Sequence, residues 1–159
     1  MLLMINKFSQ LSFSKLVRVH AESLTQNFSS RGSTSDVQMR EAEMEFYEYL
    51  KSTFFHQSHA YYAIWEESGQ YVSALRLEPY WDGYLICALE TAPEYRRLGF
   101  AEKLVTELQG FLSNSSAGKL YCPGRRSGDS GTRCLCGVCP SAGNRAVSGF
   151  LHRGVYLPV

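Results

Sequence analysis

Residues 91–101 read Thr91-Ala92-Pro93-Glu94-Tyr95-Arg96-Arg97-Leu98-Gly99-Phe100-Ala101, and this stretch decides the fold. The apolar run before it, residues 84–89 (YLICAL), predicts a buried strand. The segment after it has apolar residues at helical spacing, namely Phe100, Ala101, Leu104, Val105, Leu108, Phe111 and Leu112. We therefore expect a turn that joins a strand to the N-terminus of an amphipathic helix.

A turn of this kind can bind an anion. The first backbone N–H groups of a helix lack partners within the helix, and the helix dipole places positive charge at the same end. Gly99 lets the backbone approach a phosphate closely, and Arg96 and Arg97 add fixed positive charge. The stretch favours a pyrophosphate site. The alternative is an ordinary strand–turn–helix whose arginines are only solvated.

Residues 96–101, R-R-L-G-F-A, resemble the signature of the GNAT superfamily of acetyl-CoA-dependent N-acetyltransferases, which is Arg/Gln-x-x-Gly-x-Gly/Ala. The preceding strand, the turn Pro93-Glu94-Tyr95 and the following helix match that family as well. The resemblance implies that acetyl-CoA is the co-substrate and that a primary amine of a small molecule or protein is the acceptor. It also implies a set of cofactor-binding residues, mostly through the backbone: Leu89, Glu90, Thr91, Arg96, Arg97, Leu98, Gly99, Phe100, Ala101 and Glu102.

The remaining sequence patterns predict an α/β (α+β) fold with a mixed, mostly antiparallel central sheet flanked by helices, in the order β-α-α-β-β-β-α-β. The first helix has a serine available as its N-cap, and Asp36 can cap the second. A hairpin is expected at Glu67-Ser68-Gly69-Gln70. The expected strands are at 1–8, 60–66, 71–78, 84–91 and 119–122, and the expected helices are at 12–26, at 36–54 and from residue 100.

Length and composition are those of one domain over residues 1–159, because 159 residues with 45% apolar content can bury a sizeable core. The net charge of +1 gives no reason to expect nucleic acid or an acidic membrane as a partner. The apolar start, residues 1–5, is too short for a signal sequence, and no run has the length of a membrane span. We expect a cytoplasmic protein that is a monomer or a homodimer.

Acetyl transfer to an amine requires a group that removes a proton from the attacking ammonium. Glu90 is the first candidate for this base, because it interrupts an apolar run on the strand beside the expected thioester. Burial there would raise the pKa of Glu90. The alternative is a strand-end glutamate paired with Arg76 or Arg96. Glu78, at the end of the preceding strand, is the second candidate.

The segment from 122 to 159 is atypical, because its composition shifts abruptly to Gly, Arg, Cys and Ser. Residues 144–155 resemble only thinly the family's closing turn and tyrosine-bearing helix. Leu151 falls where that tyrosine, the general acid for the leaving thiolate, is expected. His152 and Tyr156 are the candidate substitutes. The segment is either a divergent C-terminus or a translation product of another reading frame.

Three cysteines, Cys134, Cys136 and Cys139, are closely spaced in this segment, with Cys122 and His152 nearby in sequence. Thiolates of this kind can bind zinc, but the matching second C-x-x-C pair is missing, so we expect no metal. The alternative to an acetyltransferase is a non-catalytic or impaired CoA-binding domain of the same fold. A metal-binding module is the third hypothesis.

Overall fold

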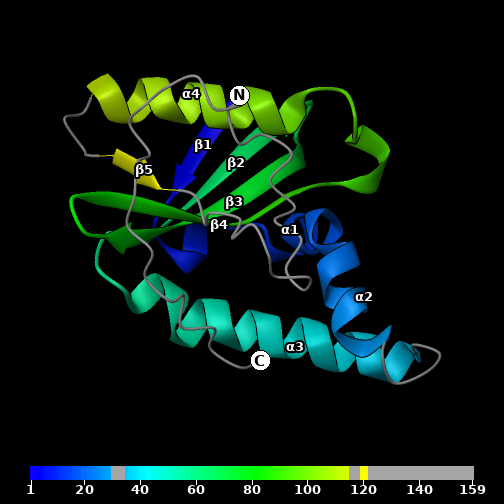
Figure 1. The fold of residues 1–159 in the computed structure, drawn as a ribbon. Helices are drawn as coiled ribbons and strands as arrows, with labels where there is room; N and C mark the ends of the chain where they lie inside the picture. Colours follow the sequence, from blue (N-terminus) through cyan, green and yellow to red (C-terminus); the bar gives the residue numbers. More distant parts are fainter. Residues whose placement is uncertain (30–34, 115–118, 122–159) are drawn as a thin grey trace, which may run out of the picture.

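The computed structural model describes residues 1–29, 35–114 and 119–121 (Figure 1). Within them, five strands form one sheet in the order β1-β2-β3-β4-β5. The first four are antiparallel neighbours, and β5 runs parallel to β4, so the expected mixed, mostly antiparallel sheet is confirmed. The strands are β1 (Leu2–Ile5), β2 (Tyr61–Glu67), β3 (Gln70–Tyr80), β4 (Gly83–Thr91) and β5 (Lys119–Tyr121).

Helices lie on both faces of this sheet. The longest of the described helices are α3 (Asp36–Ser52) and α4 (Phe100–Asn114), preceded in the chain by α1 (Phe13–Val19) and α2 (Ala21–Ser29). Short 3-10 turns are η1 (Phe8–Gln10), η2 (Phe54–His56) and η3 (Pro93–Tyr95). Helix α4 covers one face, whereas α1, α2 and α3 lie on the other (Figure 1).

Two hydrophobic clusters fill the space between the sheet and these helices. The period-two alternation of a strand explains the division, because Tyr62 and Ile64 belong to one cluster and Ala63 and Trp65 to the other. The cluster beneath α1 and α3 also contains Leu16, Val19, Leu50, Phe54 and Ala74. The cluster beneath α4 also contains Leu75, Leu77, Ile86, Leu89, Leu104 and Leu108. The sheet therefore separates an α1–α3 face from an α4 face.

The helix expected over 12–26 is in fact two helices, because the chain breaks at His20. Helix α1 ends at Val19 with His20 as its C-cap, and α2 begins at Ala21. The backbone N–H of His20 still donates to the carbonyl of Leu16, and that of Leu24 donates to the carbonyl of His20. Apolar spacing alone did not reveal the break, since buried residues occur on both sides of it.

The predicted cap of the second helix is wrong. Ser35 is the N-cap of α3, and its side chain accepts a hydrogen bond from the backbone N–H of Gln38 at 3.3 Å. The Gln38 side chain in turn accepts from the backbone N–H of Ser35 at 3.0 Å, which completes a capping box. Asp36 is the first helical residue instead, where its charge complements the helix dipole. Ser12 occupies the N-cap position of α1 without a side-chain capping bond to any described residue.

Strand β4 contains a bulge that determines which way its side chains face. Ala74 pairs with Glu90 but Arg76 pairs with Cys87, so β4 holds one more residue than β3 over this interval. Ala88 lies at this point with a positive φ of 51°. Because of the extra residue, Ile86 and Leu89 both pack on the α4 face. Glu90 is thereby turned to the α1–α3 face.

Within the described segments, no helix is both long and apolar enough to cross a membrane. The cytoplasmic location stays a prediction. So does the extent of the domain over 1–159, because 122–159 lies outside the described residues.

Candidate functional site

The turn between β4 and α4 has the form expected from its sequence. Arg97 and Gly99 have positive φ values of 63° and 80°. Helix α4 starts at Phe100, and its first hydrogen bond is donated by the N–H of Lys103 to the carbonyl of Gly99 at 3.0 Å. In the described part of the chain, no group accepts a hydrogen bond from the backbone N–H groups of residues 97–102. These donors are available to a ligand.

The space beside this turn fits a phosphate group. A Cβ placed on Gly99 would meet no atom of the described protein within 4 Å. Unpaired N–H groups, an open approach and the positive end of α4 are the three features that a helix N-terminus offers to an anion. The turn can therefore hold a pyrophosphate mainly through its backbone.

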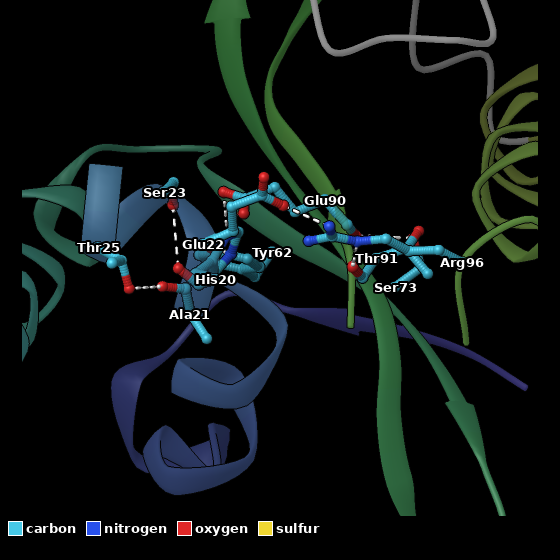
Figure 2. A network of polar contacts seen from close by, with 10 residues as sticks. All are labelled: His20, Ala21, Glu22, Ser23, Thr25, Tyr62, Ser73, Glu90, Thr91 and Arg96. Atoms are coloured by element: carbon cyan, nitrogen blue, oxygen red, sulfur yellow. Dashed lines mark hydrogen bonds and ion pairs between the residues drawn. The ribbon is translucent and has the colours of Figure 1, made fainter. Parts of the chain in front are cut away.

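The two arginines of the turn have different surroundings. Arg96 donates from Nε to the carbonyl of Thr91 at 3.1 Å, and its Nη1 forms an ion pair with Glu22 (Figure 2). Its charge thus ties the turn to α2. Arg97, by contrast, forms no ion pair with any residue that the structure describes. Arg97 is the better placed of the two to offer charge to a ligand.

Glu90 lies near the end of β4 and is part of a chain of three side chains. Its Oε1 lies 2.7 Å from Nδ1 of His20, and Nε2 of His20 lies 2.6 Å from the hydroxyl oxygen of Tyr62 (Figure 2). The His20 side chain is 3% exposed, and Tyr62 is fully buried. These three hydrogen-bonded side chains connect the α1–α2 break to β2 and β4 on the α1–α3 face of the sheet.

The prediction that the pKa of Glu90 is raised is wrong. Burial does push it upward, but the hydrogen bond from His20 and the electrostatic attraction to it act in the opposite direction. Hydrogen bonds from the side chain and backbone of Ser23 add to this effect. Together they hold the pKa of Glu90 below its usual range, because each of them favours the ionised form.

The alternative partners proposed for Glu90 are also wrong. Arg96 pairs with Glu22, and the Arg76 guanidinium lies 5.2 and 5.8 Å from the ring centroids of Tyr49 and Phe54. The partner is His20, which the sequence patterns did not single out. The available signal was a lone histidine between two apolar helical segments, and such a residue is common in protein cores.

The backbone next to Glu90 is fixed to the neighbouring strand. Ser73 on β3 donates from Oγ to the carbonyl of Glu90 at 2.9 Å and lies 3.0 Å from Oγ1 of Thr91 (Figure 2). The carbonyls of Glu90 and Thr91 are therefore engaged by Ser73 and Arg96. Cofactor binding by the backbone of Leu89, Glu90 and Thr91 stays a prediction.

Glu78, the second candidate base, belongs to a different group of side chains. It hydrogen-bonds to the thiol of Cys87, and burial together with the charge of Glu78 raises the pKa of that thiol to about 11. The buried Nε of Arg76 on the same strand has no hydrogen-bond partner among the described residues. Glu78 thus acts on Cys87 and is not part of the Glu90 chain.

The other predicted site residues fall outside the described part of the chain. These are His152, Tyr156 and the cysteines at 122, 134, 136 and 139. Among the described residues, no three side chains of the metal-ligating types gather at one point. The general acid and the zinc hypothesis both stay predictions.

The model of the acetyltransferase (GNAT) family matches residues 22–129. No curated protein matches the sequence significantly. A solved GNAT family acetyltransferase from Staphylococcus aureus is 13% identical, with a TM-score of 0.55 and coverage of 96% of this chain and 97% of that one.

Two further solved structures share the fold. The PaiA N-acetyltransferase from Thermoplasma acidophilum, in complex with coenzyme A, is 14% identical with a TM-score of 0.54 over 80% of this chain and 81% of that one. The ribosomal-protein-alanine N-acetyltransferase from Brucella melitensis biovar Abortus is 12% identical with a TM-score of 0.52 over 82% of this chain and 83% of that one. At such identities the likeness extends to the fold alone.

Proposed function

Because the chain belongs to the acetyltransferase (GNAT) family, we propose that it transfers an acetyl group from acetyl-CoA to a primary amine of a small molecule or protein. The observation that carries this proposal is the turn before α4: among the described residues no group accepts from the N–H groups of residues 97–102, and a Cβ on Gly99 would meet no atom within 4 Å. A carboxylate, Glu90, lies on the strand that leads into this turn. A strand that carries a largely buried carboxylate and leads into an anion-binding turn suits a CoA thioester and an ammonium acceptor.

The turn would hold the co-substrate by its pyrophosphate. The N–H groups of residues 97–102 supply the hydrogen bonds, and Arg97 adds charge. The small residues Gly99 and Ala101 keep side chains out of the path of the phosphates. Acetyl-CoA itself supplies the activated acetyl group, and the coenzyme A bound in the PaiA structure of the same fold supports this choice of co-substrate.

Glu90 would act as the base. The carboxylate is ionised at neutral pH and can accept a proton from the acceptor ammonium, and its lowered pKa makes it a weaker base than an unperturbed glutamate. The freed nitrogen then forms the amide bond while the thioester C–S bond breaks, and the departing thiolate takes up a proton. His152 and Tyr156 are the proposed donors of that proton.

A second candidate is an impaired CoA-binding domain of the same fold. The observation that favours it is Leu151, which stands where the family's tyrosine is expected. Loss of a general acid lowers turnover without affecting the turn that binds CoA. The two candidates therefore share cofactor binding and differ in turnover.

Thermal unfolding with CoA, together with a thiol-release assay over a panel of amines, tests both candidates. We expect CoA to raise the melting temperature, because a ligand selective for the folded state stabilises it. Glu90→Gln should lower kcat on the order of a hundredfold or more while leaving this rise unchanged. Glu45→Gln, on the exposed side of α3, is the matched control.

The outcomes separate the candidates. A rise in melting temperature without amine-dependent thiol release would support the impaired domain. Absence of the rise would contradict both. Full activity of Glu90→Gln would exclude Glu90 as the base.

A further inference from the structure

The side chains of His20, Tyr62 and Glu90 form a connection between strands that are not neighbours. Tyr62 is on β2 and Glu90 on β4, with β3 between them. Strands two positions apart are separated by about 9–10 Å. The imidazole of His20 bridges this distance beneath β3. The β3 residue paired with Glu90 is Ala74, whose small side chain leaves room on that face.

The hydrogen-bond partners determine how the protons of His20 are arranged. An ionised Glu90 only accepts, so Nδ1 of His20 must carry a proton and donate it to Oε1. Tyr62 keeps its own proton, because burial raises the pKa of its hydroxyl well above the usual range. Among the described residues, that hydroxyl has His20 as its hydrogen-bond partner. When the imidazole is neutral, this hydroxyl donates to Nε2, and the Nδ1–H tautomer is the one that suits both partners. When the imidazole is protonated, Nδ1 still donates to Glu90.

This arrangement fixes the carboxylate while leaving it able to bind a substrate. A carboxylate accepts about four hydrogen bonds. His20 donates one from Nδ1, and the Ser23 hydroxyl donates to the carbonyl of His20 at 3.1 Å. The carboxylate therefore keeps acceptor capacity for an N–H of the incoming amine.

We propose that His20, hydrogen-bonded to Tyr62, is a positioning residue that orients the Glu90 carboxylate toward the acceptor amine. The role rests on the proposed acetyltransferase function and acts through Glu90, not on the acetyl group. The proposal predicts that orientation of the Glu90 carboxylate depends on a hydrogen-bond donor at the Nδ1 position and depends less on the bulk of the imidazole ring.

Other charged groups surround Glu90 and bear on any pH dependence. Glu22 on α2 and Arg96 after β4 neutralise each other in an ion pair. Arg76 on β3 acts electrostatically on Tyr62 and Tyr49. Among the described residues, His20 makes the largest contribution to lowering the Glu90 pKa, and Ser23 makes a smaller one. Removal of His20 should therefore change the Glu90 pKa more than removal of any other neighbour.

The test compares three variants of the full chain. His20→Ala removes the donor, and His20→Asn restores an N–H close to the Nδ1 position. Tyr62→Phe removes the hydroxyl that bonds to Nε2. Phe46→Leu is the matched control, since its ring packs edge-on against His20 at 5.6 Å between centroids without a hydrogen bond.

Two readouts are needed. The pKa of Glu90 is measured by NMR titration of ¹³C-labelled glutamate carboxylates, with the signal assigned through Glu90→Gln. The acidic limb of the pH profile of kcat/KM is measured in the thiol-release assay. We expect His20→Ala to raise the Glu90 pKa, move the acidic limb to higher pH and lower kcat on the order of tenfold to a hundredfold. His20→Asn should recover most of this loss, and Tyr62→Phe should show a smaller shift in the same direction.

Phe46→Leu should lower the melting temperature without moving either pH readout. An unchanged Glu90 pKa in both His20→Ala and Tyr62→Phe would overturn the proposal, as would an equal shift in Phe46→Leu. If His20→Ala fails to fold, His20→Asn and Tyr62→Phe still decide. Absence of turnover in the wild type would instead overturn the proposed function, and with it the catalytic role of the His20–Glu90 contact. The two failures are distinguishable, because the NMR titration measures the effect of His20 on the Glu90 pKa without any need for activity.

Discussion

Gly83 and Lys119 are so close across β4 and β5 that no side chain fits between them. A Cβ on Gly83 would lie 2.0 Å from the carbonyl oxygen of Lys119 and 2.5 Å from its backbone nitrogen. The two residues are paired at the start of the β4–β5 ladder. The parallel attachment of β5 to an otherwise antiparallel sheet therefore depends on a glycine at this position.

Gly83→Ala should destabilise the protein by about 1–3 kcal/mol, because the clash is with backbone that has little freedom to move. Urea unfolding measures the change. Gly110→Ala is the control with the opposite sign: it lies on the exposed side of α4 with nothing within 4 Å of its Cβ. It should stabilise by about 0.5–1 kcal/mol through helix propensity. Equal stability of the two variants would contradict the close approach.

Gly99→Glu should abolish the rise in melting temperature that CoA produces. The substitution places bulk and negative charge beside the N–H groups of the turn, and the positive φ adds backbone strain of about 1 kcal/mol. Gly69→Glu is matched to it, because Gly69 has a φ of 74° and equally open space but lies in the β2–β3 turn. That variant should keep the CoA effect. If both variants respond alike, the turn is not the cofactor site.

The ionisation of Glu90 should stabilise the fold in a pH-dependent way. Its pKa is lowered on folding, so this contribution is complete above the unfolded-state value of about 4.3 and is lost as the pH falls through the folded-state value. The difference in unfolding free energy between wild type and Glu90→Gln should therefore narrow as the pH is lowered from 6 toward 3, which is checked by urea unfolding at each pH. A difference that stays constant over this range would contradict a lowered pKa.

The thiol of Cys87 should react slowly with alkylating reagents at neutral pH. With a pKa of about 11 instead of 9.0, it has roughly a hundredfold less thiolate at pH 8 than an unperturbed cysteine. Alkylation by iodoacetamide, followed at the Cys87 peptide by mass spectrometry, should accelerate steadily up to about pH 11. Glu78→Gln should speed the reaction at pH 8, since it removes a neighbouring charge that raises the pKa. A rate at pH 8 equal to that of a free peptide thiol would refute this.

Much of the fold could be predicted because its signals are local. The strand, the turn and the helix around residues 84–112 follow from apolar periodicity, and the β2–β3 hairpin follows from Ser68-Gly69. The order of the elements agrees with the family resemblance. What local patterns did not predict are two interruptions, the break at His20 and the bulge at Ala88.

The candidate site also contains one residue that could be predicted from sequence and one that could not. Glu90 could be chosen from sequence, because a carboxylate in an apolar strand is conspicuous. Its partner could not, since His20 is 70 residues away and reaches it only through tertiary packing. The predicted shift of the Glu90 pKa had the wrong sign for the same reason. The apolar run indicated burial, which raises the pKa, but it gave no sign of the hydrogen-bond donor that lowers it.

The extra residue at Ala88 also bears on how this chain tolerates insertion and deletion. Side chains before and after it are out of phase, so the strand has two halves of opposite parity. Removal of Ala88 would restore a continuous pleat and leave Leu89 on the α4 face and Glu90 on the α1–α3 face, because Ile86, Cys87, Leu89 and Glu90 would then alternate regularly. A deletion among the regularly paired residues 84–87 would instead exchange the faces of the side chains on one side of it, so β4 should tolerate the loss of Ala88 better than the loss of a neighbouring residue.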